Sequence, residues 1–258
     1  MKPKALVLQA YGTNRDFDVM EALSLAGADP VGVPLNELRA HKTLFQDFQL
    51  LVLPGGFSYA DALGAGKLLA LDLTSYFQAE ITAFVDSGKP VIGICNGFQA
   101  LVKSEIFTGN HGSSPPITLT FNASGHFECR WVTMKPVSQK CIWTKDLKEE
   151  ITCPVAHGEG NFQVADHSLL STFQTQDQIA LMYICPDGSP AHGDYPANPN
   201  GSIRDITGIC NPQGNVLGLM PHPENHIYAW QHPRHTRGEQ GRSGLKLFEN
   251  GVSYAKQL

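Results

Sequence analysis

The first half of the chain alternates short apolar runs with longer stretches in which apolar residues recur at helical spacing. The apolar runs at 4–9, 31–35 and 48–53 have the length of strands. Residues 16–26 and about 66–86 have helical spacing, and a glycine follows each stretch closely. Strands that alternate with helices pair in parallel, so this half predicts an α/β fold with a doubly wound, mostly parallel sheet and flanking helices.

The second half has a different pattern, in which extended segments are separated by turns. A stretch rich in Pro, Gly, Asn and Asp at 186–202 predicts a long loop, and 206–219 predicts a hairpin. A last helix is expected at about 243–256. No repeat or linker divides the chain, so we expect one domain over residues 1–258. Antiparallel strands are expected at 117–137, 151–165 and 178–185.

The strand-to-helix step at 89–99 carries the strongest chemical motif. A short apolar run ends in Gly-x-Cys-x-Gly around Cys95 and passes directly into a helical pattern. This is the arrangement of a nucleophile elbow, with cysteine where hydrolases carry serine. Gly93 and Gly97 allow a tight turn without a Cβ clash. The turn would place the sulfur at a helix N-terminus, whose partial positive charge favours the thiolate.

A candidate base lies far downstream, in the Pro-His-Pro-Glu segment at 221–224. A cysteine nucleophile needs a base, and the base needs an acceptor that orients it; His222 and Glu224 can supply both. The two prolines disfavour a helix, so we expect an extended segment in which residues two apart point the same way. A histidine by itself is often structural, but the elbow and Glu224 together favour a catalytic role.

A second strand end supplies a candidate oxyanion site. Pro54-Gly55-Gly56 follows the apolar run at 48–53, and a tetrahedral oxyanion needs two aimed N–H donors. Gly56 and Asn96 could each offer one. Pro-Gly-Gly alone is usually an ordinary turn. Both segments follow strands of the same predicted sheet, so we expect them to be neighbours at its carboxyl edge.

Other motifs are weaker. His157 and Glu159 lie between glycines after an apolar run, which suits either close approach to a small polar ligand or a plain turn. His222 and His226 have zinc-like spacing only if they lie on a helix, and prolines flank the first of them. We therefore expect no metal, and a solvated loop for the later histidines. Asn198–Ser202 predicts only a loop.

Composition narrows the function classes. The 258 residues carry a net charge of −5, which is unlike the basic stripe of a nucleic-acid binder. No apolar run approaches a membrane span, and the first strand is too short for a signal peptide. Six cysteines without Cys-x-x-Cys spacing indicate a reducing compartment, hence the cytoplasm. The five other than Cys95 are expected to be small buried apolar residues.

Taken together, these motifs resemble the class I, or triad, glutamine amidotransferases, which have a flavodoxin-like fold. The chain is more closely similar to the glutaminase subunits of phosphoribosylformylglycinamidine synthase, an enzyme of purine biosynthesis. The similarity covers almost the whole chain. The matching segments are Pro54–Tyr59, Gly93–Gln99, Cys129–Val132, Ala156–Gly160, Tyr195–Ser202 and Met220–Glu224.

The resemblance implies a mechanism and a set of site residues. Cys95 would be the nucleophile, His222 the base and Glu224 its orienting group, with Gly56 and Asn96 as oxyanion donors. The implied contacts to L-glutamine are Gln99, Phe57, His157 and Glu159. Ammonia would pass to a separate synthetase subunit, and a small accessory subunit is a further candidate partner. ATP and Mg²⁺ are expected on that synthetase and no cofactor here, since this chain has no Gly-x-x-x-x-Gly-Lys-Ser/Thr loop.

Some positions depart from the family pattern. Ala60 stands where glycine is expected, and Asn225 where arginine often follows the Pro-His-Pro-Glu segment. The tail at 226–241, with Trp230, is longer than in short versions of the subunit, and either a partner contact or a surface loop would account for it. Two other functions stay open. One is a different Cys-His-Glu hydrolase, such as a peptidase or γ-glutamyl hydrolase; the other is a non-catalytic assembly subunit.

Overall fold

The computed structural model describes residues 1–104, 106–107, 116–239, 241 and 243–258. Its frame is a nine-stranded mixed sheet with the strand order β2-β1-β3-β4-β11-β10-β9-β6-β7. A separate two-stranded sheet pairs β5 with β8. None of the helices in the described ranges is both long and apolar enough to cross a bilayer.

The element bounds follow the chain. The strands are β1 Lys4–Gln9, β2 Asp29–Pro34, β3 Leu50–Leu53, β4 Val91–Ile94, β5 Ile117–Thr120, β6 Glu128–Pro136, β7 Ile151–His157, β8 Asn161–Val164, β9 Ile179–Ile184, β10 Ile206–Cys210 and β11 Val216–Leu219. The α-helices are α1 Asp16–Leu25, α2 Leu35–Ala40, α3 Lys67–Tyr76, α4 Gln78–Asp86, α5 Asn96–Lys103, α6 Ser168–Thr175 and α7 Leu245–Ala255.

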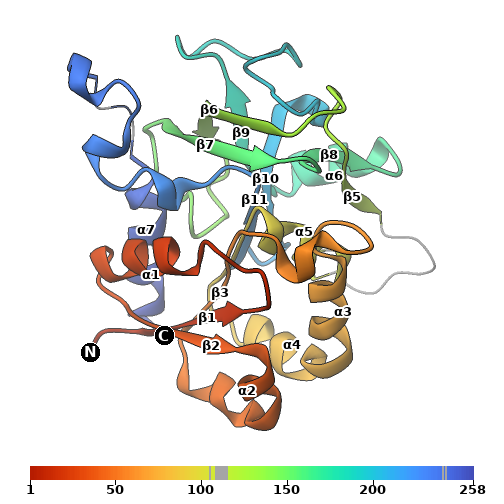
Figure 1. The fold of residues 1–258 in the computed structure, drawn as a ribbon, viewed down its shortest axis with the longest axis vertical. Coiled ribbons are helices and arrows are strands. Elements are labelled where there is room, and N and C mark those ends of the chain that lie inside the picture. The colour runs from red at the N-terminus through yellow and green to blue at the C-terminus, as the bar shows by residue number, and fades with distance from the viewer. Residues whose placement is uncertain (105, 108–115, 240, 242) are drawn as a thin grey trace.

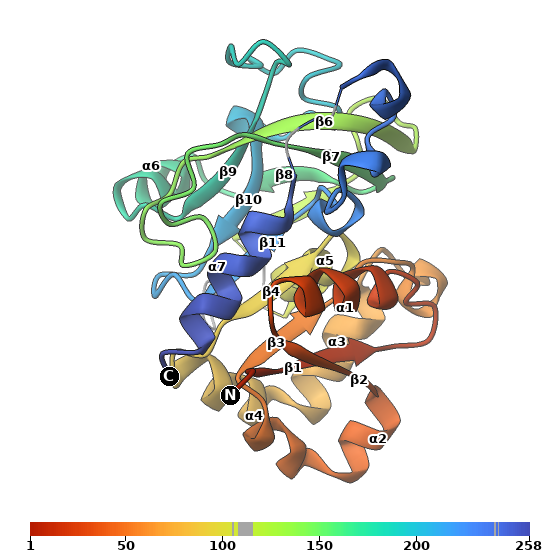
Figure 2. The ribbon, with the colours of Figure 1, turned by 90° about the vertical axis from the view of Figure 1, so that its left-hand side faces the viewer.

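The first five strands of the sheet order are parallel to one another. In β3 and β4 every residue is buried, as expected for central strands that are covered on both faces. Helices α1 and α7 cover one face, and α3, α4 and α5 lie on the other (Figure 1). The view turned by 90° shows α1 and α7 crossing the near face (Figure 2). This layering brings the carboxyl ends of β1, β3 and β4 to one edge.

The remaining strands run antiparallel and extend the same sheet. The hairpin of β10 and β11 joins the two parts, because β11 is parallel to β4 and antiparallel to β10. Strands β9, β6 and β7 follow, with β7 at the sheet edge. The predicted fold class, a doubly wound α/β sheet with antiparallel strands in the second half, is confirmed.

The single helix predicted at 66–86 is wrong, because the chain breaks into α3 and α4. Phe77 leaves the helical conformation with φ −127° and buries its ring, whose centroid lies 5.9 Å from that of Phe45. The helical spacing continues across the break, so the apolar pattern does not reveal it. The short helices α2 and α6 were also missed. They have six and eight residues, too few for a clear period.

The long strands predicted at 117–137 and 151–165 are each two strands. A turn separates β5 from β6 and another separates β7 from β8, and β5 then pairs with β8 outside the main sheet. Apolar residues alternate through the first of these turns, and the second is only three residues long, so the pattern marks extended chain without showing where the sheet changes. The prediction that the other cysteines are buried is wrong for Cys129, which is exposed, and for Cys185, which is partly exposed.

Candidate active site

Cys95 sits in a strained turn between β4 and α5. Its φ of 50° and ψ of −106° are rarely adopted by a residue with a Cβ. A Cβ at Gly97 would lie 1.9 Å from the carbonyl oxygen of Leu53, and one at Gly93 would lie 2.9 Å from the carbonyl of Gly97. The two glycines therefore let β3, β4 and α5 approach closely enough to form the turn. The first N–H groups of α5 have no partner inside the helix.

His222 and Glu224 contact each other at the end of β11. The Nδ1 atom of His222 lies 2.6 Å from Oε1 of Glu224, and both side chains are buried. The extended segment predicted here is wrong, because Pro223–Asn225 forms a 3₁₀ turn. The side chains meet across this turn, which the prolines permit since a proline fits the first position of a helix.

His222 also lies beside Cys95, whose charge acts on the imidazole. This arrangement requires that residue 55 has no side chain. A Cβ there would lie 2.7 Å from Cε1 of His222, while the Cβ of Cys95 would be 3.5 Å away. Segments around residues 55, 95 and 222 thus converge at one point, and the three predicted triad residues form one connected chain.

The surroundings favour the charged form of His222. Burial lowers its pKa, but the negative charges of Glu224 and Cys95 and the hydrogen bonds to both raise it to about 10. A charged imidazole therefore faces Cys95, and Glu224 holds the ring at its Nδ1 atom.

The edge of β7 forms a wall of this site. The carbonyl of Pro154 accepts the backbone N–H of His222 at 2.8 Å. The carbonyl of Ala156 lies 3.7 Å from the Cys95 sulfur. The antiparallel half of the sheet therefore holds both partners, a role that neither residue's sequence context indicated.

The predicted oxyanion donors are Gly56, in the loop after β3, and Asn96, the first residue of α5 and the neighbour of Cys95. Gly56 has φ +133°, and a Cβ there would lie 2.7 Å from the N atom of Asn14. Thr13 forms an isolated β-bridge with Gly56, and the N–H of Phe57 donates to Gly12. The turn after β1 thus supports the Gly56 loop. Sequence reasoning missed this turn, although its Gly-Thr-Asn follows a strand at the same sheet edge.

The side chain of Asn96 ties this loop to the nucleophile turn. Its Oδ1 atom accepts from the N–H of Ser58 at 3.2 Å and from the Ser58 hydroxyl at 2.5 Å. Its Nδ2 atom donates to Asp61 at 2.9 Å and to Gln99 at 3.1 Å. The side chain is used for architecture, so the group of Asn96 that could serve an oxyanion is its backbone N–H.

Gln99 and Glu159 are two of the expected glutamine contacts, and in the structure they join helix α5 to the loop after β7. The Gln99 side chain donates to the Glu159 carbonyl at 2.6 Å and accepts from Asn96. The Glu159 carboxylate accepts from the N–H of Ala65 at 3.2 Å and lies 3.7 Å from the Lys103 ammonium. Their polar groups thus have partners within the protein, and their contact with glutamine stays a prediction.

His157 is held as a neutral acceptor. The Asn122 amide donates to the carbonyls of His126 and His157 and accepts from the N–H of Gly160, which fixes its orientation. Oδ1 of Asn122, 3.0 Å from Nδ1 of His157, therefore accepts a hydrogen bond from the Nδ1–H of that ring. Burial, helped by the charge of His222, lowers the pKa of His157 to about 3. Its Nε2 atom has no partner among the described residues.

Phe57, the remaining expected contact, lies near the surface. It is 43% exposed and stacks on Phe127, with the ring centroids 6.3 Å apart. Phe127 comes from the β5–β6 loop, so the pair joins the two halves of the chain beside the Gly56 loop. Neither Phe127 nor Asn122 was singled out from the sequence, because both lie in a turn of ordinary composition.

The later histidines form an aromatic cluster. The rings of His226 and His232 both pack edge-on against Trp131, at 5.0 Å and 5.3 Å between centroids. In the described part of the chain, no three His, Cys, Asp or Glu side chains are arranged to hold a metal ion. The tail is partly folded, since it contains the 3₁₀ turns Ala229–Gln231 and His235–Arg237. A partner contact by Trp230 stays a prediction, and residue 240 lies outside the described residues.

The sheet, the strained cysteine turn and the buried His–Glu pair define a glutamine amidotransferase of the triad class. The family model described as "CobB/CobQ-like glutamine amidotransferase domain" matches residues 2–255, and the chain belongs to this family. Among individual proteins, the chain is similar over its full length to one subunit type, the PurQ subunit of phosphoribosylformylglycinamidine synthase.

Two PurQ relatives match over nearly their full length. The chain is 52% identical to that of Treponema denticola, covering 98% of this chain and 99% of the relative. It is 40% identical to that of Dehalococcoides mccartyi, covering 100% and 99%. The solved structure of PurLQS from Thermotoga maritima matches with a TM-score of 0.74 at 32% identity, covering 98% of this chain and 99% of the matched chain. The resemblance inferred from the motifs is confirmed.

The structure describes both positions that depart from the family pattern, Ala60 and Asn225. Ala60 has φ 54° and ψ 29°, in the left-handed region where glycine is at ease. Asn225 donates to Asp18 on α1 at 2.9 Å, an acidic partner that an arginine could also use.

Replacing Ala60 by glycine should stabilise the protein. The left-handed conformation costs a residue with a Cβ roughly 1–2 kcal/mol, which exceeds the extra backbone entropy of glycine. We expect a gain on the order of 1 kcal/mol and a melting temperature about 2–4 °C higher in a thermal scan. Ala62 is the matched control, since its φ of −55° is ordinary and Ala62→Gly should destabilise. A lower melting temperature for both variants would contradict the strain argument.

His157 should make the protein less stable in mild acid. The unfolded chain binds a proton at this histidine near pH 6.5, whereas the folded chain does so only near pH 3, so stability falls as the pH drops between these values. In His157→Asn, unfolding by urea at a series of pH values should show a loss that is shallower by roughly 1 kcal/mol per pH unit. His157→Gln packs differently but should give the same slope. A slope equal to that of the original chain in both variants would show that His157 does not titrate in this way.

Proposed function

We propose that this chain is the glutaminase subunit of phosphoribosylformylglycinamidine synthase. It hydrolyses glutamine to glutamate through a thioester on Cys95 and supplies ammonia for purine biosynthesis. The observation that carries the proposal is the connected series of side chains from Cys95 through His222 to Glu224. The full-length similarity to PurQ supports it independently.

The first half-reaction forms the thioester. The Cys95 thiolate attacks the side-chain amide carbon of glutamine, and the carbonyl electron pair moves onto oxygen. The N–H groups of Gly56 and Asn96 stabilise this oxyanion. Protonated His222 gives its proton to the amide nitrogen, the C–N bond breaks, and ammonia leaves. A γ-glutamyl thioester remains on the sulfur.

The second half-reaction releases glutamate. Neutral His222 takes a proton from a water molecule, whose oxygen attacks the thioester carbon. The same two N–H groups receive the second oxyanion. The C–S bond then breaks, glutamate leaves, and the thiolate with its imidazolium partner is restored. Throughout the cycle Glu224 accepts a hydrogen bond from the Nδ1–H of His222, which fixes the ring and stabilises its cation.

The ammonia passes to partner subunits. The matched Thermotoga maritima structure is of an assembly named PurLQS, and the partners of this chain are accordingly PurL, the synthetase, and PurS, the small subunit. ATP and Mg²⁺ belong to the synthetase step, and this chain works as one domain without a cofactor of its own. The setting is the cytoplasm, as the cysteine usage suggested. Gln99, Phe57, His157 and Glu159 are retained as residues that shape the glutamine site.

The two other functions are distinguished by simple assays. A peptidase or γ-glutamyl hydrolase would leave free glutamine intact and cleave a peptide or γ-glutamyl substrate. A non-catalytic subunit would resist labelling of Cys95 by an electrophilic glutamine analogue. The intact contact between the sulfur and the imidazole favours the glutaminase over both.

Replacing Cys95 by alanine should abolish the use of glutamine. We expect glutamine-dependent synthesis by the assembled enzyme to fall by at least about 10³-fold, because no nucleophile remains. Synthesis from free ammonia should persist, since the synthetase is untouched. Cys129→Ala removes an exposed thiol and is the matched control, with both activities expected to remain. Retained glutamine hydrolysis in Cys95→Ala would refute the nucleophile assignment.

Glu224→Ala should damage the glutaminase less than His222→Ala. Loss of His222 removes both proton transfers. Loss of Glu224 removes only the group that orients the imidazole and stabilises its cation, so this effect should be roughly 10–100-fold smaller. Steady-state glutaminase kinetics of the assembled enzyme measure both. Glu224→Gln tests whether the negative charge is needed to hold the His222 tautomer, since the amide can retain the contact with Nδ1 without the charge. The reverse order of damage would contradict the roles given to the two residues.

A further inference from the structure

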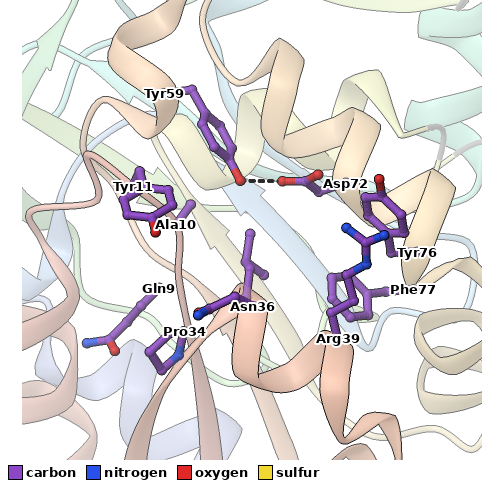
Figure 3. Close-up of a pocket in the computed structure, with 11 residues that line it drawn as sticks. Gln9, Ala10, Tyr11, Pro34, Asn36, Arg39, Tyr59, Asp72, Tyr76 and Phe77 are labelled. Atoms are coloured by element: carbon purple, nitrogen blue, oxygen red, sulfur yellow. Dashed lines mark hydrogen bonds between the residues drawn. The ribbon is translucent and has the colours of Figure 1, made fainter.

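A groove with a volume of about 410 Å³ lies apart from the catalytic cysteine, beside the start of α2 (Figure 3). Its walls come from the end of β1, from α2, from Tyr59 and from α3. Tyr11 and Tyr59 meet edge to face, with centroids 6.4 Å apart. The volume falls in the usual range for small-molecule sites. None of the steps proposed above uses this groove.

The groove occupies a favoured place in this kind of fold. After β1 the chain forms β2 on one side of β1, and it then forms β3 on the other side. The strand order therefore reverses at β1. Open α/β sheets bind ligands outside the carboxyl ends of their strands at such a reversal. The catalytic residues use a different position, next to β3, β4 and β11.

Arg39 provides a cation that is not neutralised. Its guanidinium carbon lies 3.6 Å above the centre of the Tyr76 ring, and it forms no ion pair with a described carboxylate. Stacking uses the flat face of the group and leaves its N–H edge free for a bidentate contact with a phosphate. The stack also restrains the side chain, which reduces the entropy cost of binding.

The groove also presents an acceptor and aromatic surface. Asp72, which lies on α3 like Tyr76, accepts the hydroxyl of Tyr59, and the close-up draws this bond between Tyr59 and the pair of Arg39 and Tyr76 (Figure 3). Its carboxylate keeps acceptor capacity beyond this bond, which suits a sugar hydroxyl. Tyr11 is 79% exposed at the rim, where a planar base could stack on it.

We propose that this groove binds a ribonucleoside 5′-monophosphate. The phosphate contacts the free edge of Arg39, the ribose hydroxyls donate to Asp72, and the base stacks against Tyr11. The three contacts together distinguish this ligand from a free anion or a free nucleoside. The site is independent of the glutaminase proposal, because its binding can be measured without glutamine.

Calorimetric titration of the full chain with AMP tests the proposal. We expect saturable binding, weakened about tenfold or more for adenosine, which lacks the phosphate, and for ribose 5-phosphate, which lacks the base. Arg39→Gln should weaken AMP binding by a similar factor, with Arg39→Lys in between because lysine lacks the planar fork. The matched control is Arg237→Gln, which removes an arginine in the 226–241 tail and should leave binding unchanged.

Asp72→Asn tests the sugar contact, because asparagine still accepts the Tyr59 hydroxyl. It should reduce the preference for AMP over 2′-deoxy-AMP. The proposal is overturned if AMP does not bind up to millimolar concentration, if Arg39→Gln binds it unchanged, or if inorganic phosphate binds as tightly as AMP. Labelling of Cys95 by a glutamine analogue in Arg39→Gln should remain normal. Normal labelling without AMP binding would therefore refute this site and leave the glutaminase proposal intact.

Discussion

The site depends on one close approach, in which the imidazole of His222 lies against the bare backbone of Gly55 and reaches the sulfur of Cys95. A methyl group at that glycine would lie within 2.7 Å of the ring. Gly97 is equally restricted, because the turn at Cys95 packs there on the end of β3. Because Gly55 and Gly97 have no side chain, the segments around residues 55, 95 and 222 can meet. The buried Glu224 then keeps the His222 ring in place.

Two buried histidines near this point have opposite electrostatic settings. His222 faces Glu224 and the sulfur, which together outweigh the cost of burying a charge. His157 has only a neutral amide partner, so burial keeps it uncharged. A second cation beside His222 would weaken the attraction between imidazolium and thiolate. The Asn122 turn thus supports the electrostatics of the site from a distance, through hydrogen bonds and not through charge.

Much of the frame could be predicted because local rules applied. Apolar runs bounded by glycine located the parallel strands, and Gly-x-Cys-x-Gly located the turn at Cys95. The predictions were wrong where contacts between segments far apart in the sequence determine the backbone conformation. Phe77 breaks a helical pattern to reach the core, and β5 leaves the main sheet to pair with β8. Gln99 and Glu159 were singled out for a ligand, yet their polar groups join α5 to the loop after β7.

The sequence by itself determined the fold class and the family and singled out the candidate reactive groups, because these follow from short motifs whose residue types and spacing are tied to one geometry. Only the tertiary structure decided that a 3₁₀ turn brings Glu224 to His222, that the carbonyls of β7 flank the catalytic pair, and which protonation state each buried histidine favours. These features depend on atoms from segments far apart in the chain. Burial and the charge of neighbours exist only after those segments have packed together.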